Sequence, residues 1–353
     1  MQAHLKRQYR SYWIIVGILM FGLFLPAGHS LYAQVTPGFF PQDIDRTELE
    51  PSCFCKPGVR FKSRSKGLKL VYGTTNSGYF KPENFELTPP RNNFRRIEQY
   101  EIDIKAPLVL KDNFNLIVGY KLFKESFRFD NIGNDYENVL LALRGESLRS
   151  STITAYMTKP LNETKYLIGV FRYSSNGNYG SKLIAFENRY AIYKMFVAYV
   201  HKPTPDKEIG FGLNVQKSFR RFAAIPLIIY NKTFNNRWGI EAILPGSFFG
   251  RYNFGARAIA LMGFEFSGKT YRLSMEDDMN PFDYSYNHSE ISGVLRYERH
   301  LYSWIWANFK VGWRVNFRSE FEAKSDFSTD FQMDPTDGLF LQLGIFVSPG
   351  SRD

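Results

Sequence analysis

A two-residue alternation of side-chain type most strongly constrains how this chain can fold. In the segment 99–106 the odd positions are polar or charged and the even positions are apolar. The same split returns in the segment 308–317, where the odd positions are apolar and the even positions are Asn, Lys, Gly or Arg. Because successive side chains of a β-strand point to opposite faces, each segment predicts a strand that lies between an apolar and an aqueous medium.

These two segments supply the residues predicted for the two faces. The side chains predicted to line a polar interior are Glu101, Asp103, Lys105, Lys310 and Arg314. The side chains predicted to face lipid are Tyr100, Ile102, Ile104, Phe309, Val311, Trp313 and Val315. Isolated charges in a dry interior are very costly, so such an interior must be hydrated or internally salt-bridged.

Strand signals of this kind recur along most of the chain. Fourteen candidate strands can be marked, and merging the short ones around Pro245 would give twelve. Their ranges are 68–74, 96–106, 114–122, 151–158, 166–173, 189–200, 208–216, 223–230, 238–244, 248–254, 257–266, 291–299, 307–317 and 339–347. An open sheet edge in lipid would leave unpaired backbone groups, so a membrane sheet has to close. The sequence predicts an all-β fold: a closed antiparallel transmembrane β-barrel of about 12–14 strands over residues 67–348.

The connections between these candidates alternate in length. Short polar turns are predicted at Leu110–Asn113, Pro160–Glu163, Pro203–Asp206 and Thr233–Asn236. Longer loops are predicted at Ser174–Asn188, Ser274–Glu290 and Ser319–Asp337. Outer-membrane barrels have short turns at the periplasmic rim and longer loops outside the cell. The alternation therefore supports the barrel prediction independently.

The N-terminus predicts export. Its first twelve residues hold three basic residues and no acidic one, and an uncharged apolar run follows from Trp13 to Leu25. Thirteen helical residues at about 1.5 Å each are too short for a hydrocarbon core of about 30 Å, and the layout is that of a secretory signal. We predict a signal peptide over residues 1–33, cut between Ala33 and Gln34; a retained membrane anchor is the alternative. The predicted location is the outer membrane of a Gram-negative bacterium.

The other segments are a Pro-rich periplasmic arm or plug at residues 34–66 and a C-terminal tail at 349–353. The arm holds Cys53 and Cys55, which are too close in sequence for good disulfide geometry and too few for a metal site. No cofactor or metal is predicted, and the role of the two cysteines stays open. The last strand, Leu339–Val347, is typical of the signal that barrel-insertion machinery reads, although seven residues follow Phe346.

Charge bounds the partners. The signal holds three of the 45 Lys and Arg and none of the 34 Asp and Glu, so the mature chain carries a formal charge of +8. We find no nucleic-acid-binding module, which argues against that class of partner. Lipid phosphates and anionic solutes are the plausible partners for the excess cations, and solvated loops are the simpler explanation. Outer-membrane lipid is an expected partner, and a solute or protein partner is unknown.

Enzymatic signals are weak. Outer-membrane phospholipases carry His-x-Ser-Asn-Gly, and here Ser175-Asn176-Gly177 follows Tyr173 in place of the histidine. A serine without an adjacent base is a weak nucleophile. His288-Ser289 is another pair of adjacent histidine and serine, and neighbours on a strand point to opposite faces. The acidic run 276–283 lacks the pattern of an EF-hand loop. We predict no catalytic residue and no enzyme.

Three stretches carry a resemblance to a known family. They are Ile240-Glu241-Ala242-Ile243-Leu244-Pro245-Gly246, Arg251-Tyr252-Asn253-Phe254 and Lys269-Thr270-Tyr271-Arg272-Leu273, together with the signal that ends at Ala33. Over residues 67–348 the chain resembles an uncharacterised outer-membrane β-barrel family of Bacteroidota, a domain of unknown function. The resemblance implies an outer-membrane barrel and brings no catalytic residues.

Three functions are compatible with these observations. The first is a non-enzymatic, porin-like barrel that forms a small passive or plugged channel for small solutes. The second is a structural or docking barrel whose extracellular loops bind a partner. The third, and weakest, is an outer-membrane lipid hydrolase.

Overall fold

The computed structural model describes residues 57–82, 93–130, 132, 140, 143, 148–180, 182–219, 221–275, 282–323 and 330–348. The chain divides into two compact units, residues 1–32 and 33–353, and every described residue belongs to the second unit. The signal peptide, most of the arm with Cys53 and Cys55, most of the acidic run and the tail 349–353 lie outside the described residues.

Strands dominate the described part of the chain. No helix in this part is long and apolar enough to cross a membrane. The elements are β1 (Leu68–Thr75), β2 (Gly78–Pro82), β3 (Asn93–Lys111), β4 (Phe114–Phe129), β5 (Leu148–Asn162), β6 (Lys165–Gly177), the 3-10 turn η5 (Asn188–Tyr190), β7 (Ala191–Thr204), β8 (Lys207–Ser218), β9 (Arg221–Thr233), β10 (Trp238–Leu244), β11 (Ser247–Asn253), β12 (Ala258–Met275), β13 (Phe282–Tyr302), β14 (Ile305–Ala323), β15 (Phe331–Pro335) and β16 (Gly338–Val347).

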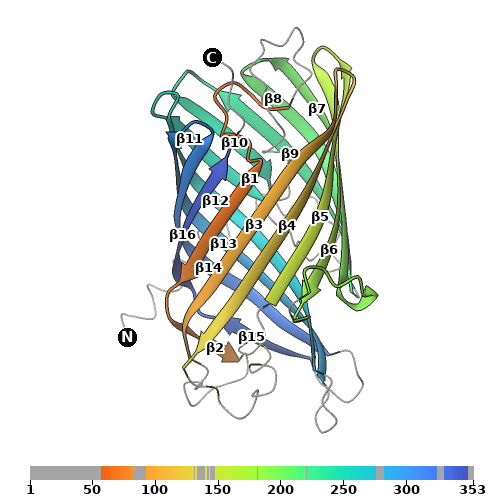
Figure 1. Cartoon of the computed structure of the whole chain (residues 1–353), viewed down its shortest axis with the longest axis vertical. Helices are drawn as coiled ribbons and strands as arrows, with labels where there is room; N and C mark the ends of the chain where they lie inside the picture. Colours follow the sequence, from red (N-terminus) through yellow and green to blue (C-terminus); the bar gives the residue numbers. More distant parts are fainter. Residues whose placement is uncertain are drawn as a thin grey trace, which may run out of the picture. The chain divides into compact units, whose positions relative to one another are not determined.

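All of these strands except β2 and β15 close into one antiparallel barrel of fourteen strands (Figure 1). From β3 to β14 each strand pairs with its neighbours in the chain, and β14 also pairs with β16. β1 completes the ring, because Leu70 lies opposite Ile102 of β3 on one side and opposite Ile345 of β16 on the other. The predicted closed antiparallel barrel is confirmed, at the upper strand number.

The barrel strands correspond one for one to the fourteen predicted strands, so the merger around Pro245 is wrong. Residues 245 and 246 form a tight turn between the paired strands β10 and β11. The predicted loops 274–290 and 319–337 are also wrong in part, because they contain the start of β13, the end of β14 and all of β15. At this end of the barrel inward side chains are apolar, because they pack into a buried cluster, so the sequence of the strands does not alternate between apolar and polar residues.

The two ends of the barrel have different connections. At one end, which we call the turn end, six connections have two to four residues each, and the predicted short turns are confirmed. Leu68 and Val347, the first residue of β1 and the last of β16, pair at this end. The opposite end, the loop end, carries longer connections, but β8–β9 and β10–β11 are joined there by two residues each.

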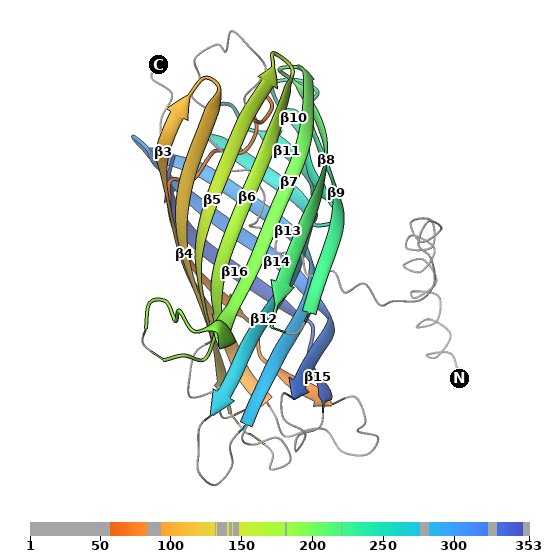
Figure 2. The same ribbon diagram turned by 90° about the vertical axis from the view of Figure 1, so that its right-hand side faces the viewer.

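The barrel wall is uneven toward the loop end. β10 and β11 have seven residues each, whereas β12 has eighteen. The pairing of β11 with β12 ends toward the loop end at Ser247, which lies opposite Glu265. β12 continues to Met275, and its Arg272 pairs in parallel with Gly177 of β6. Figure 2 shows β12 and β13 extending past the ends of β8 and β9. Fewer strands therefore surround the interior at the loop end than at the turn end.

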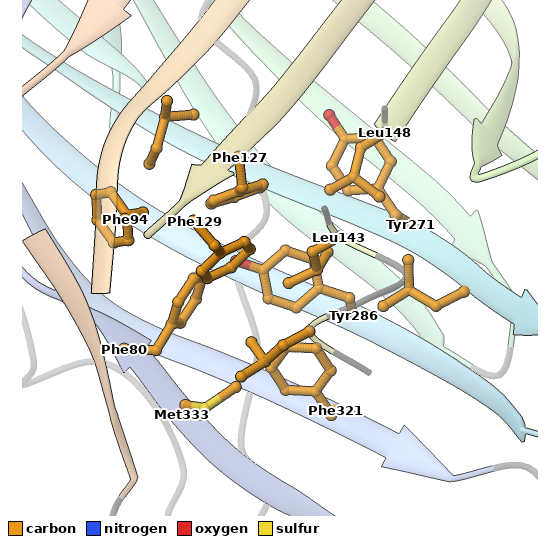
Figure 3. Packing of buried hydrophobic residues seen from close by; sticks show 13 residues of the cluster. Phe80, Phe94, Phe127, Phe129, Leu143, Leu148, Tyr271, Tyr286, Phe321 and Met333 are labelled. Carbon is orange, nitrogen blue, oxygen red and sulfur yellow. The ribbon is translucent and has the colours of Figure 1, made fainter. Parts of the chain in front are cut away.

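Apolar side chains fill the interior at the loop end (Figure 3). This loop-end cluster consists of Phe80, Phe94, Ile97, Phe127, Phe129, Leu140, Leu143, Leu148, Tyr271, Leu273, Tyr286, Phe321 and Met333. Its rings stack closely: the centroids of Tyr286 and Phe321 are 4.6 Å apart, and those of Phe127 and Phe129 are 6.0 Å apart. β2 and β15 contribute Phe80 and Met333, so the two strands outside the barrel help to cover this mouth.

A second apolar cluster, the inner cluster, lies on the inward faces of β4–β7, β9 and β10. It consists of Ile117, Tyr156, Tyr166, Ile168, Val170, Phe196, Ala198, Val200, Leu227, Ile229 and Ile243. Both faces of β6 and β7 are consequently apolar over much of their length, since Phe171 and Val197 on the outer face are exposed. The interior of the barrel is thus only partly polar.

Residues 57–66, the arm segment, are held by three buried glutamates near the turn end. The backbone N–H of Gly58 donates to Glu208 of β8 (2.9 Å), and both the N–H and hydroxyl of Ser63 donate to Glu241 of β10 (2.9 and 2.7 Å). Lys66 Nζ lies 2.7 Å from Glu298 of β13. These glutamates belong to strands spread around the barrel, so the segment crosses its interior.

Candidate functional site

The outer face carries the side chains predicted to contact lipid. Six of them are exposed, namely Tyr100, Ile102, Ile104, Phe309, Trp313 and Val315, and Val311 is half-buried. Exposed apolar side chains continue around the wall on other strands, for example Phe211 of β8 and Met262 of β12. An apolar exterior over a closed antiparallel sheet needs hydrocarbon around it. Contact of these individual residues with lipid stays a prediction.

The five residues predicted to line the interior are engaged in ion pairs. Glu101 contacts Lys69 (2.7 Å) and Lys121 (2.8 Å), and Asp103 lies 3.5 Å from Lys105. The other two, Lys310 and Arg314, contact Glu265 and Glu290 respectively. Three of the five, Glu101, Lys310 and Arg314, line one common cavity, whereas Asp103 and Lys105 do not line it.

The cavity has a volume of about 240 Å³. Its lining includes Lys66 of the arm segment and Tyr271 of the loop-end cluster, so it lies between these two parts of the interior. Nine basic side chains line it: Lys66, Lys69, Lys121, Arg172, Lys194, Lys269, Arg296, Lys310 and Arg314. Among the described residues three acidic side chains do so: Glu101, Glu265 and Glu290. Two of the basic side chains, Lys66 and Lys269, are also paired with acids outside the lining, Glu298 (2.7 Å) and Glu125 (2.9 Å). The cavity is therefore polar, with a surplus of basic side chains.

Each of the three acids is already shared between two partners. Glu101 lies between Lys69 and Lys121, and Glu265 between Lys310 and Arg296, with 3.4 Å to the latter. Glu290 contacts Arg314 (2.9 Å) and His288 (3.1 Å). These acids do not balance the positive charge of the cavity wall.

The sequence pattern missed seven of the nine basic side chains that line the cavity. Arg172 and Lys194 alternate with outward residues in the strands predicted at 166–173 and 189–200, so their inward direction was readable from the periodicity. The inward direction of Lys269 was not predictable, because the predicted strand ended at residue 266 whereas β12 runs to Met275. That these side chains share one cavity depends on the closure of the barrel, which a local pattern does not contain.

Neither of the two sequence motifs considered for hydrolysis forms an accessible serine site. Ser175 is fully buried, and the Tyr173 ring stacks on Phe186. His288 Nδ1 lies 2.6 Å from the hydroxyl of Ser319 on β14, and its Nε2 lies 3.1 Å from Glu290. This trio has the order of a serine, a histidine and a carboxylate. The Ser319 side chain is 0% exposed, which closes it to a substrate in this conformation.

Metal chemistry finds no support in the described residues. No group of three or more His, Cys, Asp or Glu side chains among them could hold a metal ion. The ion pairs and hydroxyls of the cavity are suited to binding polar or charged solutes.

A closed barrel with an apolar exterior and a charged cavity inside defines the class of the protein as a transmembrane β-barrel. Within that class the chain belongs to the family described as Domain of unknown function (DUF6268), which matches residues 74–350. The match confirms the expected membership of a family of unknown function and brings no activity.

Comparison with solved structures finds other outer-membrane proteins at low similarity. An outer membrane channel from Pseudomonas putida is 11% identical with a TM-score of 0.40, and covers 85% of this chain and 100% of that chain. A Pseudomonas aeruginosa FadL homologue is 10% identical with a TM-score of 0.40 (80% and 89% covered). The KdgM porin, solved in complex with disordered oligogalacturonate, is 8% identical with a TM-score of 0.33 (80% and 99% covered). No curated protein matches the chain.

Proposed function

We propose that the protein is a channel for small solutes in the outer membrane of a Gram-negative bacterium. The observation that carries this proposal is the charged cavity of about 240 Å³ inside the barrel. A barrel that only had to fold could fill its interior with apolar side chains, as the inner cluster does. A cavity lined by nine basic side chains is costly unless water or a solute occupies it.

In this proposal the channel is plugged, and three parts of the interior support that. The arm segment and the inner cluster occupy the interior on the turn side of the cavity, and the loop-end cluster occupies the other side. The arm segment is the part suited to move, because polar contacts to Glu208, Glu241 and Glu298 hold it and none of its residues belongs to the two large apolar clusters. Water can replace such polar contacts, although the buried ion pair between Lys66 and Glu298 is costly to break.

Planar-bilayer conductance of the mature protein tests the proposal. We expect rare, small currents from the wild type and larger, more frequent currents after deletion of residues 34–66. Adding Phe80→Ala and Phe127→Ala to the deletion removes two aromatic rings from the loop-end cluster and should raise the conductance further. Heat-modifiable gel mobility of every variant serves as the control for folding. If the wild type, the deletion variant and the deletion variant with both substitutions all show no current, the channel proposal is contradicted.

A docking barrel is the second candidate, and the two apolar clusters in the interior favour it. In that case the loops around 174–188 and 274–290 would bind the partner, and silence in the bilayer would be the expected result. The lipid-hydrolase alternative predicts that a fluorophosphonate probe labels the purified protein and that Ser319→Ala abolishes the label. Outer-membrane lipid, the barrel-insertion machinery as reader of β16, and an origin in Bacteroidota remain predictions.

A further inference from the structure

The wall of the cavity has two chemically different halves. The half built by β1, β3, β4 and β12–β14 holds all three acids of the lining, each between its two partners. The half built by β5–β8 is lined by Ser150, Thr152, Arg172, Ser174, Asn176, Ile192, Lys194 and Gln216. This second half brings two cations, three hydroxyls and two amides to the cavity and, among the described lining residues, no carboxylate.

Arg172 and Lys194 form the centre of the second half. They lie directly opposite each other in the register of β6 and β7, and their side chains are 8% and 9% exposed. Like charges in directly opposed positions destabilise a sheet, and the loss of hydration adds to the cost. Arg172 also forms a hydrogen bond with the Tyr156 hydroxyl and interacts electrostatically with Asp103. Asp103 lies 3.5 Å from Lys105 and does not line the cavity.

Hydrogen-bonding groups surround this pair of cations. The hydroxyls of Thr152 and Ser174 lie 2.9 Å apart, and the hydroxyl of Ser150 bonds the amide oxygen of Asn176 at 2.7 Å. Hydroxyls can turn their hydrogen toward a new acceptor, and a guanidinium offers a planar pair of donors that matches a carboxylate or phosphate. An oxyanion here would lower the repulsion between Arg172 and Lys194 and accept several charge-assisted hydrogen bonds.

We propose that Arg172 and Lys194, together with the hydroxyls and amides of β5, β6 and β8 that line the cavity, bind the carboxylate or phosphate group of a small solute inside the barrel. The inference rests on the proposed channel function and names its substrate class: small oxyanions. The cavity volume of about 240 Å³ limits the solute to a few heavy atoms beyond the acidic group. The cationic surplus of the opposite half attracts such a solute and repels cations.

Equilibrium dialysis of the mature protein in detergent tests the site without requiring conductance. The probes are radiolabelled inorganic phosphate, malonate and, as the neutral probe, glycerol. We expect saturable binding of phosphate, malonate or both, and none of glycerol. The anion that binds shows whether the solute carries phosphate or carboxylate. Prolonged dialysis allows the arm segment time to open.

Charge-removing variants assign the binding to these residues. Arg172→Gln and Lys194→Gln should each weaken the binding about tenfold or more, because each removes a charge-assisted contact. Both substitutions relieve like-charge repulsion, so the barrels should fold. Arg172→Lys should retain part of the affinity. The matched control is Lys217→Gln on β8, the same change of charge at an exposed position beside Gln216.

The outcomes separate the inference from the channel proposal. Anion binding that is unchanged in the Arg172→Gln, Lys194→Gln double variant, or absent at millimolar probe, overturns the site even if the protein conducts. Loss of anion binding in the double variant supports the site even if no currents are measured in the bilayers. In conducting protein the same double variant should also shift the reversal potential in a salt gradient toward cations, whereas Lys217→Gln should not.

Discussion

At the residue scale, the side-chain environment changes from an exposed apolar outer face to an ion-paired interior within one step along a strand. On β14 Trp313 is 53% exposed on the outer face, and its neighbour Arg314 is buried against Glu290. Lys310, on the same inner face, contacts Glu265. The two sides of one strand should therefore differ in how much a change of charge destabilises the barrel.

Trp313→Arg places a cation on the outer face and should destabilise the folded barrel by about 2–4 kcal/mol if the position lies near the bilayer midplane. Lys310→Gln on the inner face should cost less, because Arg296 remains beside Glu265 at 3.4 Å. Urea unfolding in lipid vesicles, followed by tryptophan fluorescence of the remaining tryptophans, measures both. Equal losses would mean that Trp313 does not face lipid.

At the element scale, the barrel depends on the contact between the long strand β12 and the end of β6. The amide of Asn176 donates to the carbonyl of Thr270 and that of Asn178 to the carbonyl of Ser274, both at 2.9 Å. These side chains satisfy part of the β12 edge that β11 leaves unpaired. Gly177 sits at the crossing, where a Cβ would lie 2.6 Å from the Arg272 carbonyl oxygen and 2.5 Å from the Tyr190 ring.

Gly177→Ala should consequently force β6 and β12 apart and destabilise the barrel by about 1–3 kcal/mol, the usual cost of overpacking. The matched control is Gly293→Ala on β13, where an added Cβ meets nothing within 4 Å. The same urea titration compares the two variants. If Gly177→Ala leaves the free energy of unfolding unchanged, the contact between β6 and β12 accommodates the added methyl group without loss of stability.

At the scale of the whole molecule, backbone pairing around a complete ring holds the fold together. The register of β1 with both β3 and β16 leaves no open edge in the ring. In lipid each unpaired backbone group would cost several kcal/mol, so the ring opens only as a unit. Buried glutamates then link the arm segment to β8, β10 and β13 across the interior.

We expect the mature protein in the outer-membrane fraction after carbonate extraction, with a gel mobility that changes only after boiling. The physical reason is the combination of an apolar exterior with a closed ring of hydrogen bonds. A soluble secreted protein without heat-modifiable mobility would contradict the transmembrane barrel. Deletion of the arm residues 34–66 should leave the heat shift in place, because the ring itself contains no residue of the arm.

Much of the fold was predictable from the sequence because the two media act on each strand locally. The alternation in 99–106 and 308–317 marks β3 and β14 without reference to any other part of the chain. The extension of β12 to residue 275 and the start of β13 at 282 were not predictable. There the two strands pair with each other, and inward side chains such as Tyr271 and Tyr286 pack into the loop-end cluster, so no regular alternation marks them.

The sequence by itself predicted the antiparallel closure, a range of about 12 to 14 strands and the direction of individual side chains, since these follow from a period of two and from the cost of an open edge in lipid. The tertiary structure decided between twelve and fourteen strands. Only the tertiary structure decided which inward side chains meet. Arg172 and Lys194 oppose each other through the register of β6 and β7, and Ser319 reaches His288 through that of β13 and β14. The curvature of a closed sheet brings such residues together across the interior, and no local pattern records it.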